Sequence, residues 1–569
     1  MRILQVLFRF GTAPPTFLIM AEHASHDHTA DDHTAHDHTD PGARVIQRHC
    51  DVAVIGGSAA GLAAALQLAR QRRTVIAVDD GTPRNAPAEH MHGYLGREGI
   101  APSDLVAIGR EEVRSYGGEI LTGRALAVRK HDDGFLVELT GGHSLVARRV
   151  LAATGVADEL PDIDGLAPRW GKDVVNCPFC HGFEVRDQRL VQIVTHPMAL
   201  HPTPLFRQLT DRLTVVVHQP QGVDDAAVAR LVEAGVPVIR ERVVRIVSGP
   251  DASVAGVELA DGRVLEADAV VAGSRFHGRA DAFAPAGVTT TPHPTGMGDV
   301  VEVDAAGQTA VPGIYAAGNL TDPSLQVLPS AAHGSRVGAM IAFSLADEDL
   351  RAGVRPSGAE ADWDHRYSDE DRMWSANPNG TLTREVTGLT PGRALDVGAG
   401  EGADALWLSE HGWQVTASDI SGNALARVRA EADRRGLSVD RLRRDANDRE
   451  AFPSGGFDLV SLQYGSFQRT PDQRGLHNLL GAVAPGGTLL VVSHDLAPLA
   501  EPVDVATQTR MFDPGAYVGI EEIVAAIGEA GDWTIEVHDT RDRPPGAAST
   551  HHVRDVLLRA VKSNRSPLA

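Results

Sequence analysis

The sequence predicts an α/β protein built from at least two separate units, and three observations support this prediction. A short apolar strand, a glycine-rich turn and a helix follow one another at residues 51–70, and the same order returns at residues 393–410. The chain has 569 residues, which is too long for one core at roughly 150 residues per domain. Hydrophobic residues make up 43% and charged residues 22%, as is ordinary for globular protein.

The overall composition excludes several classes of protein. The net charge of −22 argues against a nucleic-acid surface or an anionic membrane as the main partner. Three cysteines cannot build a disulfide framework, and no apolar run reaches the roughly 18 residues that a membrane span needs. We therefore expect a cytoplasmic enzyme whose partners are small molecules, without a nucleic-acid or membrane partner.

The N-terminal 45 residues are predicted to form a disordered, His-rich tail. Residues 26–40 repeat a polar five-residue unit with nothing apolar to bury. Its histidines could chelate a metal weakly, although a solvated linker is the favoured interpretation and we predict no metal site. Residues 1–20 are broken by Pro14-Pro15, which favours a floppy tail, or a translation start at Met20, over a signal peptide.

The first strand-turn-helix unit begins after Cys50, which we interpret as a small apolar residue opening a strand. We expect strands at 51–55 and 74–78, with the turn at 56–61 and a helix at 62–70 between them. Backbone N–H groups at such a turn can hold a pyrophosphate, provided that no side chain intervenes. Plain packing of a strand against a helix is the alternative explanation. The candidate binding residues are Gly56, Ser58, which stands where a middle glycine is usual, Gly61 and Asp79.

The sequence Cys177-Pro178-Phe179-Cys180 is the second informative feature. Two thiols at this spacing can form a disulfide that exchanges electrons with other thiols. His181 follows directly and could move protons near neutral pH. Half of a zinc site is the alternative, but no second CxxC pair exists to complete it.

Two flanking segments connect these features to a known family. Leu151 to Gly155 contains Thr154-Gly155, and Gly313 to Asn319 ends with Gly318-Asn319. Together with the first glycine turn and CPFC, this order resembles the low-molecular-weight thioredoxin reductases over about 46–350. The resemblance implies FAD along the first unit, with Cys177 as the exchanging sulfur and Cys180 as the flavin-proximal one. It also implies an FAD-binding domain at 46–165 and 281–350, around an NAD(P)-type domain at 166–280.

The NADPH site of such a reductase is not recognisable. The strand at 190–194 is followed by Thr195-His196-Pro197-Met198-Ala199, without glycine, and the strand at 215–217 leads to His218-Gln219-Pro220, without arginine. CPFCHG with this eroded site resembles the dithiol oxidases of the gliotoxin and holomycin type. Those enzymes oxidise a small-molecule dithiol and pass electrons from FAD to oxygen, so that NADPH is a doubtful cofactor here. An NADPH-dependent thioredoxin reductase and a redox sensor without turnover remain alternatives, and we expect a homodimer.

The second glycine turn reads Asp396-Val397-Gly398-Ala399-Gly400-Glu401-Gly402. With Asp419 after the next strand and Asp445-Ala446 further on, it resembles class I methyltransferases over about 362–569, after a linker at 351–361. The resemblance implies S-adenosylmethionine bound at a list of residues: Asp396, Gly398, Gly400, Gly402, Asp419 on the ribose and Asp445 near the adenine. A second NAD-binding domain is the alternative.

The segment from Trp363 to Tyr367, with Met373-Trp374, resembles small-molecule methyltransferases and is predicted to form a lid or to cap the core. Tyr464 and His494 follow strands on the cofactor side and are candidates to touch the methyl acceptor, or ordinary surface residues. The predicted chain is thus a two-domain FAD/NAD(P)-type Rossmann-like flavoprotein followed by a class I methyltransferase domain. We expect a bifunctional enzyme that oxidises a dithiol, with oxygen as the electron acceptor, and that transfers a methyl group from S-adenosylmethionine to a small molecule such as a thiol.

Overall fold

The computed structural model describes residues 46–132, 134–354, 358–368, 373, 376–495, 504–505, 511–543 and 554–564. The His-rich segment at 26–40 and Trp374 therefore lie outside the described residues. No helix in the described part of the chain is both long and apolar enough to cross a membrane.

The first glycine turn belongs to a seven-stranded sheet in the order β3-β2-β1-β6-β5-β4, with β19 paired to β6. Strands β3, β2, β1, β6 and β19 are parallel, while β4 and β5 form an antiparallel extension. The strands are β1 (Gln47–Ile55), β2 (Val75–Asp79), β3 (Glu119–Thr122), β4 (Ala125–His131), β5 (Gly134–Leu139), β6 (Ser144–Ala152) and β19 (Ile314–Ala316). The helices of this domain are α1 (Ala59–Ala69), α2 (Pro102–Arg114) and α6 (Val327–Ala352).

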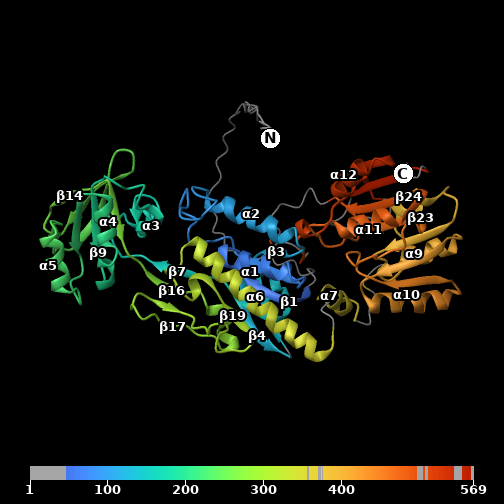
Figure 1. Ribbon diagram of the computed structural model, residues 1–569, viewed down its shortest axis with the longest axis horizontal. Coiled ribbons are helices and arrows are strands. Elements are labelled where there is room, and N and C mark those ends of the chain that lie inside the picture. Colours follow the sequence, from blue (N-terminus) through green and yellow to red (C-terminus); the bar gives the residue numbers. More distant parts are fainter. Residues whose placement is uncertain are drawn as a thin grey trace, which may run out of the picture. The chain divides into compact units, whose positions relative to one another are not determined.

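The centre of this sheet is buried on both faces. Val52, Ala53 and Val54 of β1 are fully inaccessible to solvent, as expected for the continuous apolar run of a central parallel strand. On one face α6 packs on α1, and both helices lie side by side in Figure 1. Gly334 and Gly338 of α6 meet the backbone of Ala60 and Ala64, so any side chain at these glycines would force the two helices apart.

A second parallel sheet has the order β11-β10-β9-β15-β8, next to a three-stranded antiparallel sheet in the order β12-β13-β14. Its strands are β8 (Val174–Val175), β9 (Leu190–Val194), β10 (Leu213–Val217), β11 (Val238–Ile239), β12 (Val243–Ser248), β13 (Val254–Leu259), β14 (Val264–Glu266) and β15 (Ala269–Ala272). Its helices are α3 (Pro178–His181), α4 (Thr203–Leu209) and α5 (Asp225–Glu233). This domain carries the CPFC segment.

Two short strands connect these two domains. The chain leaves the first sheet through β7 (Val156–Glu159) and returns through β16 (Arg275–Gly278), and the two strands pair antiparallel. A further antiparallel pair, β17 (Thr291–Pro292) with β18 (Asp299–Val300), follows the return. We call β7 and β16 together the crossing strands.

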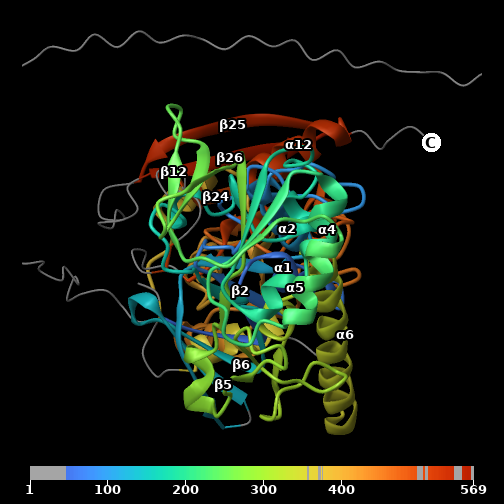
Figure 2. The same ribbon diagram turned by 90° about the vertical axis from the view of Figure 1, so that its left-hand side faces the viewer.

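The second glycine turn lies in another seven-stranded sheet, in the order β22-β21-β20-β23-β24-β26-β25, in which only β26 runs antiparallel to β24 and β25. The strands are β20 (Arg393–Val397), β21 (Gln414–Asp419), β22 (Val439–Arg443), β23 (Phe457–Gln463), β24 (Val483–His494), β25 (Trp533–Asp542) and β26 (Arg554–Lys562). The helices are α8 (Gly380–Val386), α9 (Ala403–Glu410), α10 (Gly422–Arg435), α11 (Arg474–Ala482) and α12 (Ile520–Ala530). Figure 2 shows β25 and β26 as long neighbouring arrows.

The two sheets with glycine turns confirm the predicted α/β fold class, and the structure refines several boundaries. The first strand begins at Gln47, four residues before the predicted start, because residues 47–50 pair with β6. The helices α6 and α7 (Gly358–Arg366) occupy both ends of the predicted linker at 351–361. Six 3-10 turns complete the described elements: Thr140–Gly142, Ala167–Arg169, Pro197–Leu200, Asp281–Ala286, Gly318–Leu320 and Pro514–Ala516.

Arg48 in β1 joins the first domain to the C-terminal part of the chain. Its buried guanidinium pairs with Glu119 at 2.9 Å and with Asp362 of α7 at 2.8 Å, and it also donates to the carbonyl of Met511. Tyr517 donates to the same Glu119 carboxylate at 3.0 Å. Because an unpaired buried charge costs several kcal/mol, this closed set of partners ties α7 firmly to β1.

Candidate functional site

Backbone packing shapes the first glycine turn. A Cβ on Gly56 would collide with the carbonyl of Ala153, and one on Gly61 would collide with the carbonyl of Gly56. Gly56 also has a φ of 111°, which disfavours any other residue. The backbone that precedes the N-terminus of α1 therefore carries no side chain at these glycines. Ser58 is the N-cap of α1, and its hydroxyl makes no capping hydrogen bond. This cradle fits the pyrophosphate of a dinucleotide.

Asp79 ends β2 beside that turn, but its carboxylate already has partners. It accepts from the Gly57 N–H at 3.2 Å and from the guanidinium of Arg110 at 2.5 Å. The Asp79 side chain is buried, and a Cβ on Gly57 would lie 2.5 Å from the Cβ of Asp79. Asp79 thus fixes the turn, and no motif in the sequence pointed to Arg110.

The late motif contacts the first turn directly. A Cβ on Gly318 would lie 2.8 Å from the Cβ of Ala60, and the Gly318 N–H donates to Nδ1 of His333 at 3.3 Å. The amide nitrogen of Asn319 donates to the carbonyls of Asp322 and Leu325 at 3.1 and 2.8 Å. Only the amide oxygen of Asn319 can then accept from a ligand hydroxyl. The structure brings these predicted residues together from more than 250 positions apart.

Thr154 and Gly155 lie where the chain enters the crossing strands. The Thr154 hydroxyl donates to the carbonyl of Arg279 at 2.6 Å, and the Arg279 N–H donates to the carbonyl of Gly155 at 3.0 Å. Both predicted residues therefore tie the outgoing chain to the returning chain, next to the first glycine turn.

Cys177 and Cys180 form a disulfide with a Cα–Cα distance of 5.2 Å. Cys177 is the N-cap of α3, which contains Cys180 and His181. The side-chain amide of Gln326 lies 3.9 Å from the Cys177 sulfur, within hydrogen-bond range for sulfur. Because Gln326 is the N-cap of α6, seven residues after Asn319, the disulfide faces the domain that holds the first glycine turn. No sequence pattern singled out Gln326.

His181 is half-buried, and burial lowers its pKa below the usual 6.5. Glu184 opposes this shift, while His92 adds to it through like-charge repulsion. His92 comes from the first domain and lies 3.4 Å from Glu184 and 2.7 Å from Glu98. A neutral imidazole next to the disulfide can accept a proton from a thiol at pH 7.

The position of a second nucleotide turn, after β9, is filled by the 3-10 turn Pro197–Leu200. The Met198 N–H donates to Nδ1 of His196 at 3.2 Å, and the amide nitrogen of Gln192 donates to the carbonyl of Ala199 at 2.5 Å. After β10, Nδ1 of His218 accepts from the Val243 N–H at 2.9 Å. The N–H groups of Met198 and Val243 are thus bonded to side chains of the same domain.

The second glycine turn is open at its first glycine, Gly398, and packed at its last, Gly402, where a Cβ would lie 2.7 Å from Val428. Gly398, Gly400 and Gly402 have φ values of 67°, 53° and 84°, and a Cβ on Gly398 would meet no atom within 4 Å. Asp396 precedes the turn with its side chain buried, and its Oδ2 has no hydrogen-bond partner in the described part of the protein. Burial, together with Asp404 and Asp419, raises the pKa of Asp396.

Asp419 holds this turn in place. Its carboxylate accepts from the N–H groups of Gly400 and Ser421, both at 2.8 Å. Asp364 of α7 accepts from the Ser421 hydroxyl at 2.5 Å, so the predicted lid segment lies against the same loop. Buried carboxylates beside an open turn fit a cationic cofactor such as S-adenosylmethionine. Asp445 follows β22, and its side chain accepts from the Asn447 N–H at 2.8 Å.

Tyr464 and His494 lie together after β23 and at the end of β24. Their rings stack at 4.5 Å, and the Tyr464 hydroxyl donates to Asp555 at 2.7 Å. Tyr464 has a φ of 52°, a strained backbone conformation for a tyrosine. Gly465 lies next to it, and a Cβ there would be 3.9 Å from the carbonyl of Val397, directly before the second glycine turn. Both predicted acceptor residues are therefore beside that turn.

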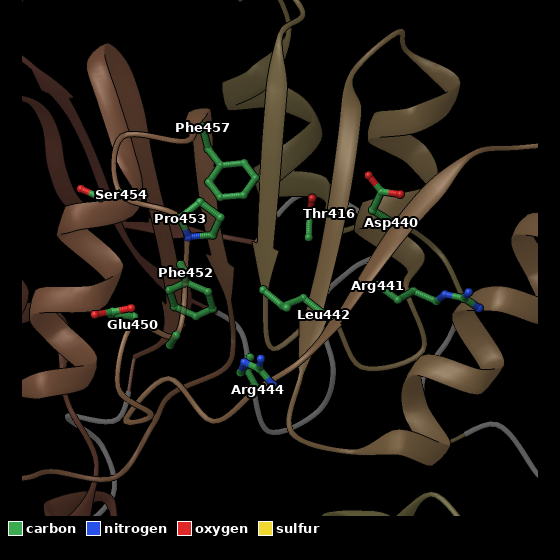
Figure 3. A pocket seen from close by; sticks show the side chains of 11 residues that line it. Thr416, Asp440, Arg441, Leu442, Arg444, Glu450, Phe452, Pro453, Ser454 and Phe457 are labelled. Carbon is green, nitrogen blue, oxygen red and sulfur yellow. The ribbon is translucent and has the colours of Figure 1, made fainter.

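A separate cavity of about 620 Å³ lies on the same sheet, away from the glycine turn. Figure 3 shows Phe452, Pro453 and Phe457 on one side and Thr416 and Leu442 of the strands on the other. Residues 444–456 form no helix between β22 and β23, which leaves this face of the sheet open. Across the described ranges, no group of three or more His, Cys, Asp or Glu side chains is arranged to hold a metal ion.

Comparisons with known proteins give a family match for each half of the chain. Residues 50–335 match the family model described as pyridine nucleotide-disulphide oxidoreductase, and residues 394–487 match a methyltransferase domain. Thioredoxin reductase sirT of Leptosphaeria maculans is 30% identical over 53% of this chain and 96% of its own length. Thioredoxin reductase tcpT of Claviceps purpurea is 28% identical over 54% of this chain and 98% of its own.

Among solved structures, the one titled "Crystal structure of HlmI" is 40% identical, with a TM-score of 0.51, and covers 55% of this chain and 97% of that protein. The first family implies a flavin cofactor and the second implies S-adenosylmethionine. The match over half of the chain, together with the disulfide and the two glycine turns, shows that this chain belongs to the pyridine nucleotide-disulphide oxidoreductase family and carries a methyltransferase domain in its C-terminal part.

Proposed function

We propose that the flavoprotein half, residues 46–354, is an FAD-dependent dithiol oxidase that uses oxygen as electron acceptor. We further propose that the methyltransferase half, residues 358–564, transfers a methyl group from S-adenosylmethionine to a small-molecule thiol. The disulfide facing Gln326 and the packed turn at Gly56 support the first proposal. The open turn at Gly398 supports the second.

The disulfide carries out the proposed oxidation by thiol-disulfide exchange. One substrate thiolate attacks the sulfur of Cys177, the Cys177–Cys180 bond breaks, and a mixed disulfide forms. The second substrate thiolate then attacks the substrate sulfur of that mixed disulfide. The substrate leaves as a cyclic disulfide, and both cysteines are left reduced. Bound FAD supplies the two-electron acceptor that restores the cysteine pair, with oxygen as the final oxidant and hydrogen peroxide as its product.

His181 is the proposed base for the substrate thiol. It directly follows Cys180, and its lowered pKa keeps the imidazole neutral at pH 7. A neutral imidazole can take the thiol proton, and the thiolate is the form that attacks a disulfide. The half-buried position also keeps the resulting imidazolium close to the carboxylate of Glu184, which stabilises it.

The observation that favours oxygen over NADPH is the turn after β9. Its Met198 N–H is bonded to the His196 side chain, and its Ala199 N–H is bonded to the carbonyl of His196. A phosphate would need free N–H groups there.

An anaerobic titration tests this choice. The flavin of the purified holoenzyme should stay oxidised with NADPH and bleach on addition of a dithiol. Rapid bleaching by NADPH, followed by thioredoxin reduction, would instead assign a reductase.

The two halves are also proposed to share a class of substrate. A dithiol can be closed to a disulfide or capped with methyl groups, and both reactions remove a reactive thiol. Fusion raises the effective concentration of one half's product near the other, to about millimolar through a short linker. Mass spectrometry of a dithiol incubated anaerobically with S-adenosylmethionine tests this idea. Methyl groups found only on oxygen or nitrogen acceptors would contradict it.

A further inference from the structure

The crossing strands β7 and β16 set the position of the disulfide relative to the flavin site. They are the two chain segments by which the CPFC-bearing domain leaves and rejoins the first domain. Any rotation at these strands would move Cys177 away from Gln326, because the contact between them is a single 3.9 Å approach. The anchors of the crossing strands therefore help to keep the disulfide beside the flavin site, together with the direct contact of His92 with Glu184 at 3.4 Å.

Arg84 of the first domain makes the strongest of these anchors. Its Nε and one terminal nitrogen donate to the two carboxylate oxygens of Asp158 in β7, both at 2.7 Å. The Asp158 side chain is only 11% exposed and also accepts from the Ser274 hydroxyl at 2.6 Å. A bidentate pair of this kind fixes direction as well as distance, so Asp158 holds the end of β7 and the start of β16 to one guanidinium.

Arg84 also reaches the segment that contacts the disulfide. Its other terminal nitrogen donates to the carbonyl of Pro323 at 3.3 Å. Pro323 stands three residues before Gln326, whose side chain approaches the Cys177 sulfur. One side chain thus connects the crossing strands with the loop on which the disulfide rests.

Other contacts also hold β16 but do not involve that loop. Asp299 accepts from the Gly278 N–H at 3.0 Å and faces His277 at 3.2 Å. Arg279 donates to the Thr82 hydroxyl at 3.2 Å. These bonds secure β16, so loss of Arg84 should loosen the domain arrangement without unfolding either domain.

We propose that Arg84 is a positioning residue that, through Asp158 and Pro323, keeps the Cys177–Cys180 pair in register with the flavin site. The role of this register in turnover rests on the proposed dithiol oxidation. The register itself is a property of the protein that can be measured without turnover.

The test compares Arg84→Ala, Arg84→Lys and the control Arg124→Ala in the full-length protein. Arg124 pairs at 3.3 Å with Asp80 in the same region, but its side chain is 67% exposed and it touches neither the crossing strands nor residues 323–326. The first readout is hydrogen exchange of the crossing-strand amides. The second is the rate at which iodoacetamide alkylates the reduced cysteine pair, with and without FAD.

For Arg84→Ala we expect exchange at 156–159 and 275–278, and alkylation of the cysteine pair, to rise about tenfold, while Arg124→Ala stays within twofold of the wild type. The dithiol-oxidation kcat should fall by a factor of about 10 to 100, as displacements near 1 Å do, with KM little changed. Arg84→Lys keeps the charge but loses the bidentate geometry, so its values should be intermediate.

Unchanged exchange and alkylation in both Arg84 variants would overturn the proposal, and so would increases spread evenly through the first domain. If Arg84→Ala does not fold, Arg84→Lys decides by the same two readouts. If the readouts change as expected but no dithiol is oxidised even by the wild type, the proposed function fails while the positioning role stands.

Discussion

In the flavoprotein half, a Cβ on Gly61 would collide with the backbone of the turn that it closes, whereas in the methyltransferase half a Cβ on Gly398 would meet no atom within 4 Å. Gly398 is instead required by its φ of 67°. The first turn is therefore part of the packed core, and its glycines are needed for folding. The second turn is open at Gly398, which leaves space for a ligand, and is packed at Gly402, where a Cβ would lie 2.7 Å from Val428. A similar glycine pattern thus reflects two physical requirements.

The largest expected difference between the two halves follows from removing the sulfurs of the cysteine pair, which should affect only the flavoprotein half. Cys177→Ser and Cys180→Ser should each lower dithiol oxidation by a factor of roughly 10³ or more, because a nucleophile acting as part of a unit is lost. Oxygen uptake measures this, and methyl transfer should be unchanged. Cys50→Ala is the matched control, since Cys50 is a buried core residue. A decrease of less than roughly tenfold in either Ser variant would contradict the exchange mechanism.

The packing difference itself predicts unequal stability losses. Gly61→Ala should destabilise the flavoprotein half by about 3 kcal/mol or more, since a Cβ is forced into backbone. Gly398→Ala should cost about 1–2 kcal/mol, the strain of a left-handed residue alone. Calorimetry with flavin release as a domain marker separates the two transitions. Equal shifts for both variants would remove the distinction between the turns.

Asp419→Ala should affect only the methyltransferase half. Its carboxylate accepts hydrogen bonds from Gly400 and Ser421, and loss of such charged bonds costs about 1.5–3 kcal/mol each. S-adenosylmethionine binding should weaken by a factor of about 10 to 100, measured by titration calorimetry. Dithiol oxidation should be unaffected, as should binding in the control Asp440→Ala, an exposed residue of β22.

The smallest effect concerns pH. Burial disfavours the charged form of His181 and lowers its pKa below the usual 6.5. The imidazole therefore stays neutral as the pH falls to 6.5. The acid limb of kcat/KM for dithiol oxidation should therefore lie below pH 6.5, and His181→Gln should remove it while lowering the rate at pH 7. The profile of methyl transfer gives the internal reference. If the acid limb persists in His181→Gln, the limb reports the titration of a group other than His181.

Local sequence predicted both glycine turns and the strands that lead to them. The strands Leu190–Val194 and Arg393–Val397 have the predicted bounds, because each is a short, mostly apolar stretch that ends at a turn. The strand at Asp51 was predicted too short. Its first residues, Gln47 to Cys50, are strand because they pair with β6 almost 100 positions away, and no local pattern contains that information.

The candidate site divides in the same way. The sequence by itself determined the residues to which we assign the proposed chemistry, because redox pairs and phosphate cradles depend on short spacings. They are Cys177, Cys180, His181 and the two glycine turns. Only the tertiary structure decided that Gln326 meets Cys177, that Arg84 holds Asp158, and that Asp364 lies against the loop after Asp419. Each of these contacts joins segments separated by more than 50 residues. A hydrogen bond between such segments depends on how whole elements pack, which the spacing of residues along the chain does not specify.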